Sequence, residues 1–185
     1  MTDAMSPAAD DLVLPFEIKP LGVRGRLVRL GPAVDDILHR HAYPASVSAL
    51  LAEAVALAAI LGAMLKFDGK FILQTKTDGP VDMIVADYVA PGKVRGYARF
   101  DGARVAALKN PGQVDLLGTG YLAMTVDQGP DMERYQGIVP LWDDHGQPLE
   151  SFQSVLEHYM LQSEQLDTTL VLAANGEVAA GLLIQ

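Results

Sequence analysis

Apolar residues run around the whole circumference of one segment, residues 44–66, with the sequence PASVSALLAEAVALAAILGAMLK. A helix at a protein surface has an apolar stripe against a polar face. Here apolar side chains occupy every side: Val47, Leu50, Leu51, Ala54, Val55, Leu57, Ala58, Ile60, Leu61, Met64 and Leu65. The pattern predicts a helix of about six turns that must be covered on all sides. Ser46 is its expected N-cap, and residues 67–69 are its expected end.

Segments with a period of two surround this helix. Residues 23–30 (VRGRLVRL) predict an arginine-rich strand in which Gly25 marks a bend or a close backbone approach. Asp78-Gly79-Pro80 and Gly129-Pro130 predict hairpin turns, and Asn175-Gly176 predicts a type I′ hairpin. The further predicted strands are residues 70–77, 81–88, 94–101, 121–128, 133–140, 170–174 and 177–184.

Three shorter segments have helical spacing. Residues 32–43 predict a short helix that Tyr43 and Pro44 end, and residues 114–117 predict a helical turn. Residues 149–163 predict an amphipathic surface helix that packs by one face only. The residues before Val23 receive no element, and the start of the chain is expected to be mobile.

A helix that is apolar all round, in a chain of strands, is most simply covered by one sheet on each face. The expected fold class is therefore α+β, a three-layer β/α/β stack with the central helix buried between two mostly antiparallel sheets. The length of 185 residues suits a single domain, residues 1–185.

Charge and composition exclude several functions. The net charge of −9 disfavours nucleic acid and anionic lipid as partners, because both require gathered Lys and Arg side chains. The absence of cysteine removes disulfides and thiolate metal sites from this chain. The acidic N-terminus lacks the pattern of a secretory signal, which predicts a cytoplasmic location. A membrane-spanning reading of residues 44–66 is disfavoured by Glu53, by the excess of alanine and by the lack of flanking charge bias.

No catalytic or metal signature emerges from the polar residues. His39 and His41 are two apart on a predicted helix and point to different sides, His145 lies in a loop, and His158 lies on the surface helix, so no metal-binding spacing is present. No serine lies in a nucleophile elbow. The Gly118–Gly120 run (Gly-Thr-Gly) lacks the lysine and spacing of a phosphate loop and is expected to form a bend before a strand.

Glu53 is the most interesting acid, because a carboxylate on a nearly all-apolar helix has a raised proton affinity. Such a group can be a general base. The structural alternative is that Glu53 meets water or an arginine, one of Arg24, Arg26 and Arg29, and this alternative is preferred.

Several blocks together resemble the redox-regulated 33-kDa heat-shock chaperone family, heat-shock protein 33, along nearly the whole chain and in the family's order. The most specific are LKFDG, QTKTDGPV and QSEQL. The remaining blocks are VRGRLVRL, ILHRHAYPASVSALLAEAVALAAILG, VRGYARFD, LLGTGYLAMTV and YQGIVPL.

The resemblance implies an ATP-independent holdase, a non-enzyme that binds unfolded client proteins during heat and oxidative stress. In the family, a C-terminal module holds zinc through four cysteine thiolates whose oxidation exposes client-binding surface. This chain has no cysteine and ends about where the family's linker would begin, so it resembles the N-terminal client-binding core alone. We therefore expect this chain to bind no cofactor, and no catalytic, cofactor-binding or metal-binding residue can be carried over from the family. We also expect its client binding not to respond to peroxide.

Three questions stay open at this point. The client-binding face is expected to be the surface helix 149–163 or a sheet face that the missing linker would cover. A homodimer is compatible with exposed edge strands and a free apolar patch. Two other functions are weighed: a hot-dog-type acyl thioester enzyme with Glu53 as its base, and a plain dimerisation or scaffold domain.

Overall fold

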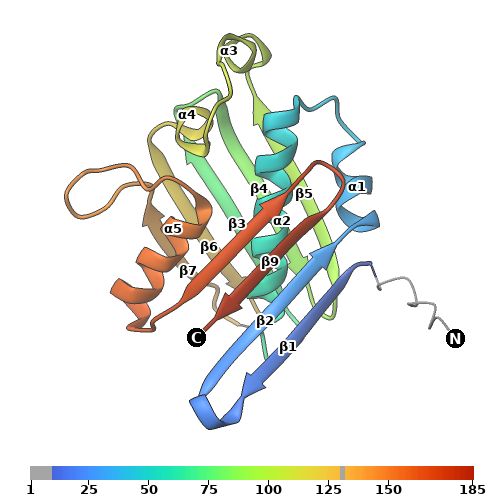
Figure 1. The fold of residues 1–185 in the computed structure, drawn as a ribbon, viewed down its shortest axis with the longest axis vertical. Coiled ribbons are helices and arrows are strands. Elements are labelled where there is room, and N and C mark those ends of the chain that lie inside the picture. Colours follow the sequence, from blue (N-terminus) through green and yellow to red (C-terminus); the bar gives the residue numbers. More distant parts are fainter. Residues whose placement is uncertain (1–9, 130–131) are drawn as a thin grey trace, which may run out of the picture.

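Two antiparallel sheets enclose one long helix in the computed structural model, which describes residues 10–129 and 132–185 (Figure 1). The strands are β1 (Leu12–Ile18), β2 (Val23–Leu30), β3 (Lys70–Thr77), β4 (Val81–Val89), β5 (Lys93–Phe100), β6 (Gly120–Asp127), β7 (Tyr135–Pro140), β8 (Thr169–Ala174) and β9 (Ala179–Ile184). The helices are α1 (Pro32–Leu38), α2 (Ala45–Gly62), α3 (Gly102–Ala107), α4 (Gln113–Leu117) and α5 (Phe152–Tyr159), with a 3₁₀ turn at Lys19–Leu21 and a π turn at Met160–Glu164. The predicted α+β class is confirmed.

The sheets have four and five strands, in the orders β1-β2-β9-β8 and β5-β4-β3-β6-β7. Every pairing between these strands is antiparallel. The four-stranded sheet joins the first strands of the chain to the last ones, so the two ends of the sequence meet in one layer. The other sheet is the meander and hairpin of residues 70–140.

Helix α2 is the centre of the molecule. It contacts β3, β4 and β5 of one sheet and β2, β8 and β9 of the other. Its side chains are buried on every side, with Leu51, Val55, Leu57 and Ile60 fully so. By length and composition α2 is the one helix in the described part of the chain that could cross a membrane, but most of it is covered by protein. The core helix of a folded domain passes the same test.

Glycines allow both sheets to lie close to α2. A Cβ on Gly96 of β5 would lie 2.7 Å from the side chain of Val55, and one on Gly181 of β9 would lie 2.6 Å from that of Ile60. The backbones of the two strands therefore occupy the space that side chains fill elsewhere.

Both expected ends of the central helix are wrong by a few residues. The N-cap is Pro44, not Ser46, and the last helical residue is Gly62, with Ala63 as C-cap. Gly62 lies under the ring of Tyr88, where a Cβ would lie 2.5 Å from Cγ of that ring. Residues 67–69 are instead the approach to β3.

Three other features differ from expectation. Residues 12–18 form β1, although no element was expected before Val23; the expected mobile start otherwise falls on residues 1–9, outside the described residues. Helix α3 was not expected; Asp101 caps it by accepting hydrogen bonds from the backbone N–H groups of Ala103 and Arg104. Helix α5 begins at Phe152 rather than at residue 149, because Ser151 is its N-cap.

The β8–β9 hairpin exists, but not as a type I′ turn. Ala174 pairs with Ala179, so four residues form the loop, and Gly176 has a positive φ of 89° whereas Asn175 does not. The Asn175 side chain accepts hydrogen bonds from the backbone N–H groups of Glu177 and Val178, which stabilises the longer loop.

Candidate functional site

The outer face of the four-stranded sheet is apolar from edge to edge. Leu14 pairs with Leu27, Leu27 with Leu182, and Leu182 with Val171, so these four side chains form one row across β1, β2, β9 and β8. Leu14, Leu27 and Val171 are 51%, 41% and 50% exposed. In Figure 1 no other helix or strand of the described residues lies in front of this sheet.

A second apolar row lies beside the first. Phe16 pairs with Gly25 and lies over it, so Gly25 is buried by an aromatic ring, as its predicted close approach requires. Ile184 continues this row, because it pairs with Gly25 on the other side. Among the strand positions that face outward here the one charged residue is Arg29, which pairs with Asp10. We call this surface the outer apolar face and define it by Leu12, Leu14, Phe16, Ile18, Val23, Leu27, Val171, Leu182 and Ile184.

The outer face of the five-stranded sheet is different in kind. Arg95 pairs with Asp87, and Arg99 pairs with Asp82 at 2.7 Å. Ile138 is an exposed apolar residue on this face, 59% accessible; it pairs with Ala123, and the next outward-facing pair of the same two strands is Gln136 with Thr125, joined by a hydrogen bond of 2.9 Å. Polar side chains interrupt the apolar ones on this face: in the row that ends at Ile138, Gln74 lies between Val85 and Ala123, so this row is not continuously apolar.

The outer edges of the four-stranded sheet are protected against unwanted strand pairing. Pro15 interrupts the donors of β1, which is an edge strand. At the other edge, the carboxylate of Glu157 on α5 accepts a hydrogen bond of 2.8 Å from the backbone N–H of Leu170. Because both edge strands are blocked, another polypeptide is more easily bound on the outer face of this sheet than as an added strand at its edge.

Helix α5 is a weaker candidate for the binding surface. Its apolar stripe faces the core, where Phe152, Val155 and Leu156 are buried. Exposed leucines follow the helix, at Leu161 and Leu166, but they do not continue the rows of the sheet. The apolar side of the predicted surface helix is therefore already used for packing.

Glu53 is held by an amide rather than by an arginine. The Nε2 of Gln113 donates a hydrogen bond of 2.5 Å to Oε2 of Glu53, and Oε1 of Gln113 accepts one of 2.9 Å from the backbone N–H of Phe152. The expected arginine partner is wrong: Arg24 pairs with Glu17, Arg29 with Asp10, and Arg26 donates to the carbonyl of Ala63. Burial raises the pKa of Glu53, and the bond from Gln113 lowers it in part.

This arrangement links three helices and does not resemble an active site. Gln113 of α4 joins Glu53 of α2 to the first turn of α5. The cavity that Gln113 lines has a volume of about 10 Å³, room for about one water and not for an acyl chain. We interpret Glu53 as a structural connector.

Two of the four histidines differ from expectation. Helix α1 ends at Leu38, so His39 is its C-cap and His41 lies in the turn beyond it, whereas His145 lies in a loop and His158 on α5 as predicted. Nδ1 of His39 lies 3.0 Å from Asp35, the ring of His41 packs between Tyr43 and Tyr97, and Nε2 of His158 lies 3.9 Å from Asp144. Within residues 10–129 and 132–185 no group of three or more His, Cys, Asp or Glu side chains could hold a metal ion. Gly118 and Gly120 form a bend before β6, with Asp78 accepting from the backbone N–H of Thr119 at 2.7 Å.

The outer apolar face was hard to predict from the sequence. Residues 12–18 alternate Leu12, Leu14, Phe16 and Ile18 on one side, a period-two signal that Pro15 obscured. In β2 the apolar positions fall on both faces, with Leu27 outward and Val28 inward, so the exposed side could not be identified from that strand alone.

The fold and this surface define a class of protein: an α+β domain with a buried central helix and an exposed apolar sheet face. The described residues contain no group of side chains that could hold a metal ion. The Hsp33 protein family model matches residues 11–185. The chain belongs to the Hsp33 family.

Relatives and a solved structure agree with this assignment. A 33 kDa chaperonin of Caulobacter vibrioides is 47% identical over 189 residues, which cover 95% of this chain and 60% of that protein. A 33 kDa chaperonin of Shewanella loihica is 39% identical over 163 residues, which cover 88% of this chain and 54% of that protein. A crystal structure of the 33 kDa chaperonin of Thermotoga maritima has a TM-score of 0.76 at 22% identity, covers 94% of this chain and 60% of that one, and shows the same fold. The chain thus spans between 54% and 60% of the length of these relatives.

Proposed function

We propose that this chain is the client-binding core of a cytoplasmic chaperone, which holds unfolded polypeptides on its outer apolar face without ATP and without catalysing a reaction. The observation that carries the proposal is the uncovered row of Leu14, Leu27, Leu182 and Val171. The naming of its relatives as chaperonins supports the general class.

The physical basis is the burial of apolar surface on both partners. An unfolded chain exposes apolar side chains that a folded one hides, and covering them removes surface from water at about 25 cal/mol per Å². A large exposed apolar patch also endangers the solubility of the protein that carries it. The net charge of −9 opposes self-association and keeps such a surface compatible with a soluble protein.

Redox control is a separate matter for this chain. The family's zinc-binding cysteines have no counterpart among these 185 residues, because the chain contains no cysteine. We therefore expect client binding by this chain to be the same before and after peroxide, once oxidation of methionine has been excluded by mass spectrometry.

Suppression of aggregation tests the proposal. The chain is mixed with an enzyme that unfolds on heating, and light scattering is followed with and without ATP. We expect the unaltered chain to suppress scattering without ATP, and Leu27→Gln with Val171→Gln to lose most of this effect, because each introduces a polar amide into the apolar row. Ile138→Gln is the matched control, an exposed apolar residue of similar accessibility on the other sheet.

The outcomes separate the remaining functions. The outer apolar face is rejected as the client site if Ile138→Gln loses as much suppression of aggregation as the double variant of Leu27 and Val171. It is also rejected if that double variant loses none. An acyl thioesterase activity abolished by Glu53→Gln would favour the enzyme alternative, which neither the comparisons nor the small cavity beside Gln113 supports. Inactivity in both assays would favour a scaffold or dimerisation domain.

A further inference from the structure

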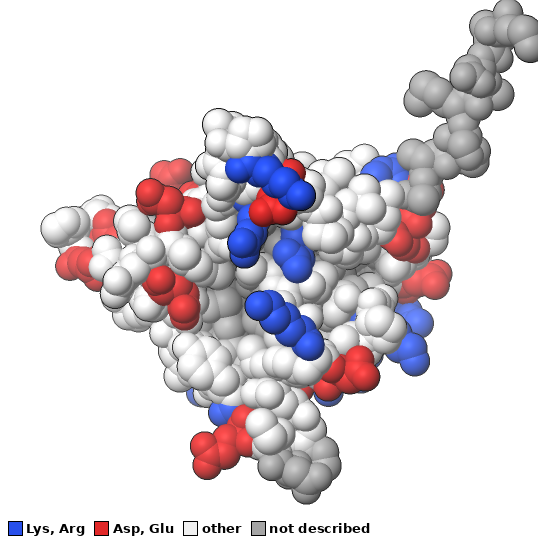
Figure 2. Space-filling view, turned by 90° about the horizontal axis from the view of Figure 1, so that it is seen from below, with Lys and Arg blue, Asp and Glu red and all other residues white. Residues whose placement is uncertain are grey.

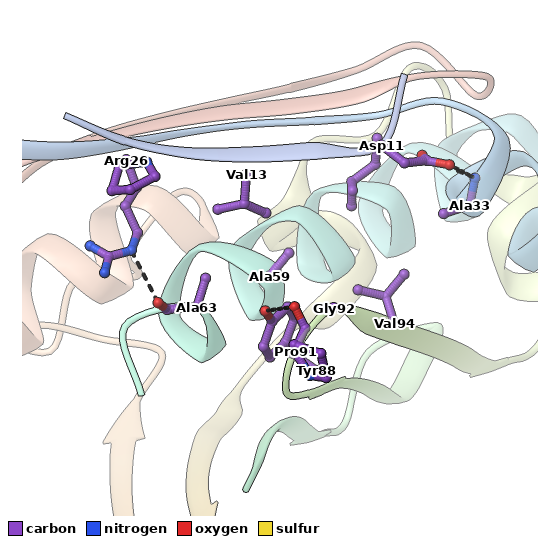
Figure 3. Close-up of a pocket in the computed structure, with 12 residues that line it drawn as sticks. Asp11, Val13, Arg26, Ala33, Ala59, Ala63, Tyr88, Pro91, Gly92 and Val94 are labelled. Atoms are coloured by element: carbon purple, nitrogen blue, oxygen red, sulfur yellow. Dashed lines mark hydrogen bonds between the residues drawn. The ribbon is translucent and has the colours of Figure 1, made fainter. Parts of the chain in front are cut away.

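A second kind of site lies at the end of the molecule where α2 stops. A cavity of about 280 Å³ opens between β1, the end of α2 and the turn that joins β4 to β5 (Figure 3). Most of the residues that line it are apolar, with Val13 on one side, Ala59 of α2 and its C-cap Ala63 behind, and Tyr88 and Pro91 on the other side, and polar atoms share the lining surface with them. The volume lies just below the range of about 300–1,000 Å³ typical of small-molecule sites, so an occupant would be small.

The walls of this cavity are held in place. The hydroxyl of Tyr88 donates a hydrogen bond of 3.0 Å to the carbonyl of Pro91, which joins two of the lining residues. The ring of Tyr88 is also packed on Gly62 of α2, with no room for a Cβ between them. A preformed cavity of this kind binds a ligand without first ordering its own walls.

Opposite charges mark the two ends of the cavity. Asp11 stands at one end, where its carboxylate accepts hydrogen bonds from the backbone N–H groups of Gly31 and Ala33 at the start of α1. Arg26 stands at the other end, near Ala63. An anionic group in this cavity would therefore be repelled from the Asp11 end and attracted to the Arg26 end.

Arg26 has hydrogen-bond donors that are available to a ligand. Its Nε donates to the carbonyl of Ala63 at 3.3 Å, a long hydrogen bond that caps the end of α2. A guanidinium has five N–H donors, so four remain. Within residues 10–129 and 132–185 no carboxylate lies within ion-pair distance of Arg26. In Figure 3 its terminal nitrogens turn away from Val13, past the end of α2.

The surroundings favour an anion although the whole chain is acidic. Figure 2 looks onto this end of the molecule and shows Lys and Arg side chains around its middle, with most Asp and Glu side chains nearer the rim. A hollow of about 560 Å³ adjoins the cavity and shares Ala63, Tyr88 and Pro91 with it. That hollow adds one cation and one anion, Lys66 and Asp68, so Arg26 decides the sign of the charge at the mouth.

From the apolar walls, the free arginine at one end and the engaged aspartate at the other, we propose that this cavity binds a small straight-chain aliphatic carboxylate. The aliphatic chain lies between Val13, Ala59 and Pro91, and the carboxylate lies at the mouth on the guanidinium of Arg26. The site is distinct from the outer apolar face, since Val13 and Arg26 alternate along their strands with the outward-facing Leu14 and Leu27.

Calorimetric titration of the 185-residue chain with octanoate, below its micellar range, tests the proposal. We expect saturable binding at one site and at least about tenfold weaker binding by R26M, the loss typical of removing a hydrogen bond to a charged group. Octan-1-ol should bind the unaltered chain more weakly than octanoate by a similar factor, because it lacks the charge. A63L should weaken both ligands, because the larger side chain fills the space that the cavity and the adjoining hollow share.

Two control variants make the result specific. R24M removes an arginine two residues away on the same strand, one that is 82% exposed and not part of the cavity, and should leave octanoate binding unchanged. L27Q alters the outer apolar face and should also leave it unchanged. Absence of saturable binding, equal effects of R26M and R24M, or loss of binding in L27Q would overturn the proposal. If R26M does not fold, equal affinity of the unaltered chain for octanoate and octan-1-ol overturns it as well.

Discussion

Gly62 occupies a position at which no side chain fits. A Cβ there would lie 2.5 Å from Cγ of Tyr88, so the last turn of α2 and the ring of Tyr88 are in direct contact through a glycine. This contact lies in the last turn of the buried helix, and Tyr88 also forms one wall of the cavity beside Arg26. The absence of a side chain at Gly62 thus allows α2 and the ring of Tyr88 to pack this closely.

Substitution of this glycine should be destabilising although it improves helix propensity. We expect Gly62→Ala to lower the free energy of unfolding by about 1–3 kcal/mol, the usual result of overpacking a core. Gly92→Ala is the matched control, because a Cβ there meets nothing within 4 Å. Urea unfolding of both variants gives the measurement. An increase in stability of about 1 kcal/mol for Gly62→Ala, as propensity alone predicts, would contradict the packing described here.

Glu53 should make stability depend on pH in a defined direction. Burial raises the pKa of its carboxyl group in the folded state, so the ionised form is disfavoured by folding. The stabilising contribution of the protonated form is present below the unfolded pKa and is lost as the pH rises through the folded pKa. The unaltered chain therefore carries a cost at neutral pH that a neutral residue avoids.

Glu53→Gln removes this cost and keeps an oxygen that can accept from Gln113. Its melting temperature should exceed that of the unaltered chain at about pH 7, and the difference should shrink as the pH falls towards about 4, where the carboxyl groups protonate. Thermal melts across this range provide the check. A difference that is independent of pH, or that grows in acid, would show that burial of the charge is not the cause.

At the scale of elements, α5 closes the open side between the two sheets and depends on its first turn. The Oγ of Ser151 accepts a hydrogen bond of 3.2 Å from the backbone N–H of Ser154, and Oγ of Ser154 in turn accepts from the backbone N–H of Ser151. This capping box orders the helix that carries Glu157 to the edge of β8.

Loss of that cap should loosen α5. Ser151→Ala should cost about 1 kcal/mol in the free energy of unfolding and should raise hydrogen exchange at the start of α5 and at Leu170. Ser163→Ala, at an exposed serine beyond the helix, is the control and should change neither quantity. Unchanged exchange at Leu170 in Ser151→Ala would mean that the edge of β8 is protected independently of the helix.

The sequence predicted the elements well where local pattern and environment agree. The fully apolar segment forms α2, and the alternating residues 70–77 form β3 as expected. The end of α2 could not be predicted, because residues 63–65 continue the apolar pattern beyond Gly62, the last helical residue. Strand β1 was missed because Pro15 interrupts its pattern, and a proline on an edge strand is acceptable only once the sheet is known.

The partner of Glu53 illustrates the same limit at the site. The three arginines of β2 made an ion pair with Glu53 the natural expectation. In the fold these arginines have other partners, and Gln113, 60 residues away in sequence, donates to the carboxylate of Glu53 instead. The two-sheet architecture itself followed from α2, because a helix apolar on all sides requires cover on all sides.

At the scale of the whole molecule, the decisive property is the contrast between its two outer faces. One sheet presents ion pairs such as Arg95 with Asp87, and the other presents Leu14, Leu27, Leu182 and Val171 in a row. Which sheet has the apolar outside depends on how strands from both ends of the sequence assemble, so pattern in a single strand could not reveal it. Helix α2 packs against the inner side of this sheet, where it contacts β2, β8 and β9.

Mapping of client contacts tests this account most directly. A photoactivatable cross-linking residue is placed at position 171 in one variant and at position 138 in another, and each is irradiated with an enzyme that unfolds on heating. The account predicts cross-links to the unfolded enzyme from position 171 and few from position 138, although both positions are exposed. Cross-links that are equal at the two positions, or that come mainly from position 138, would contradict it.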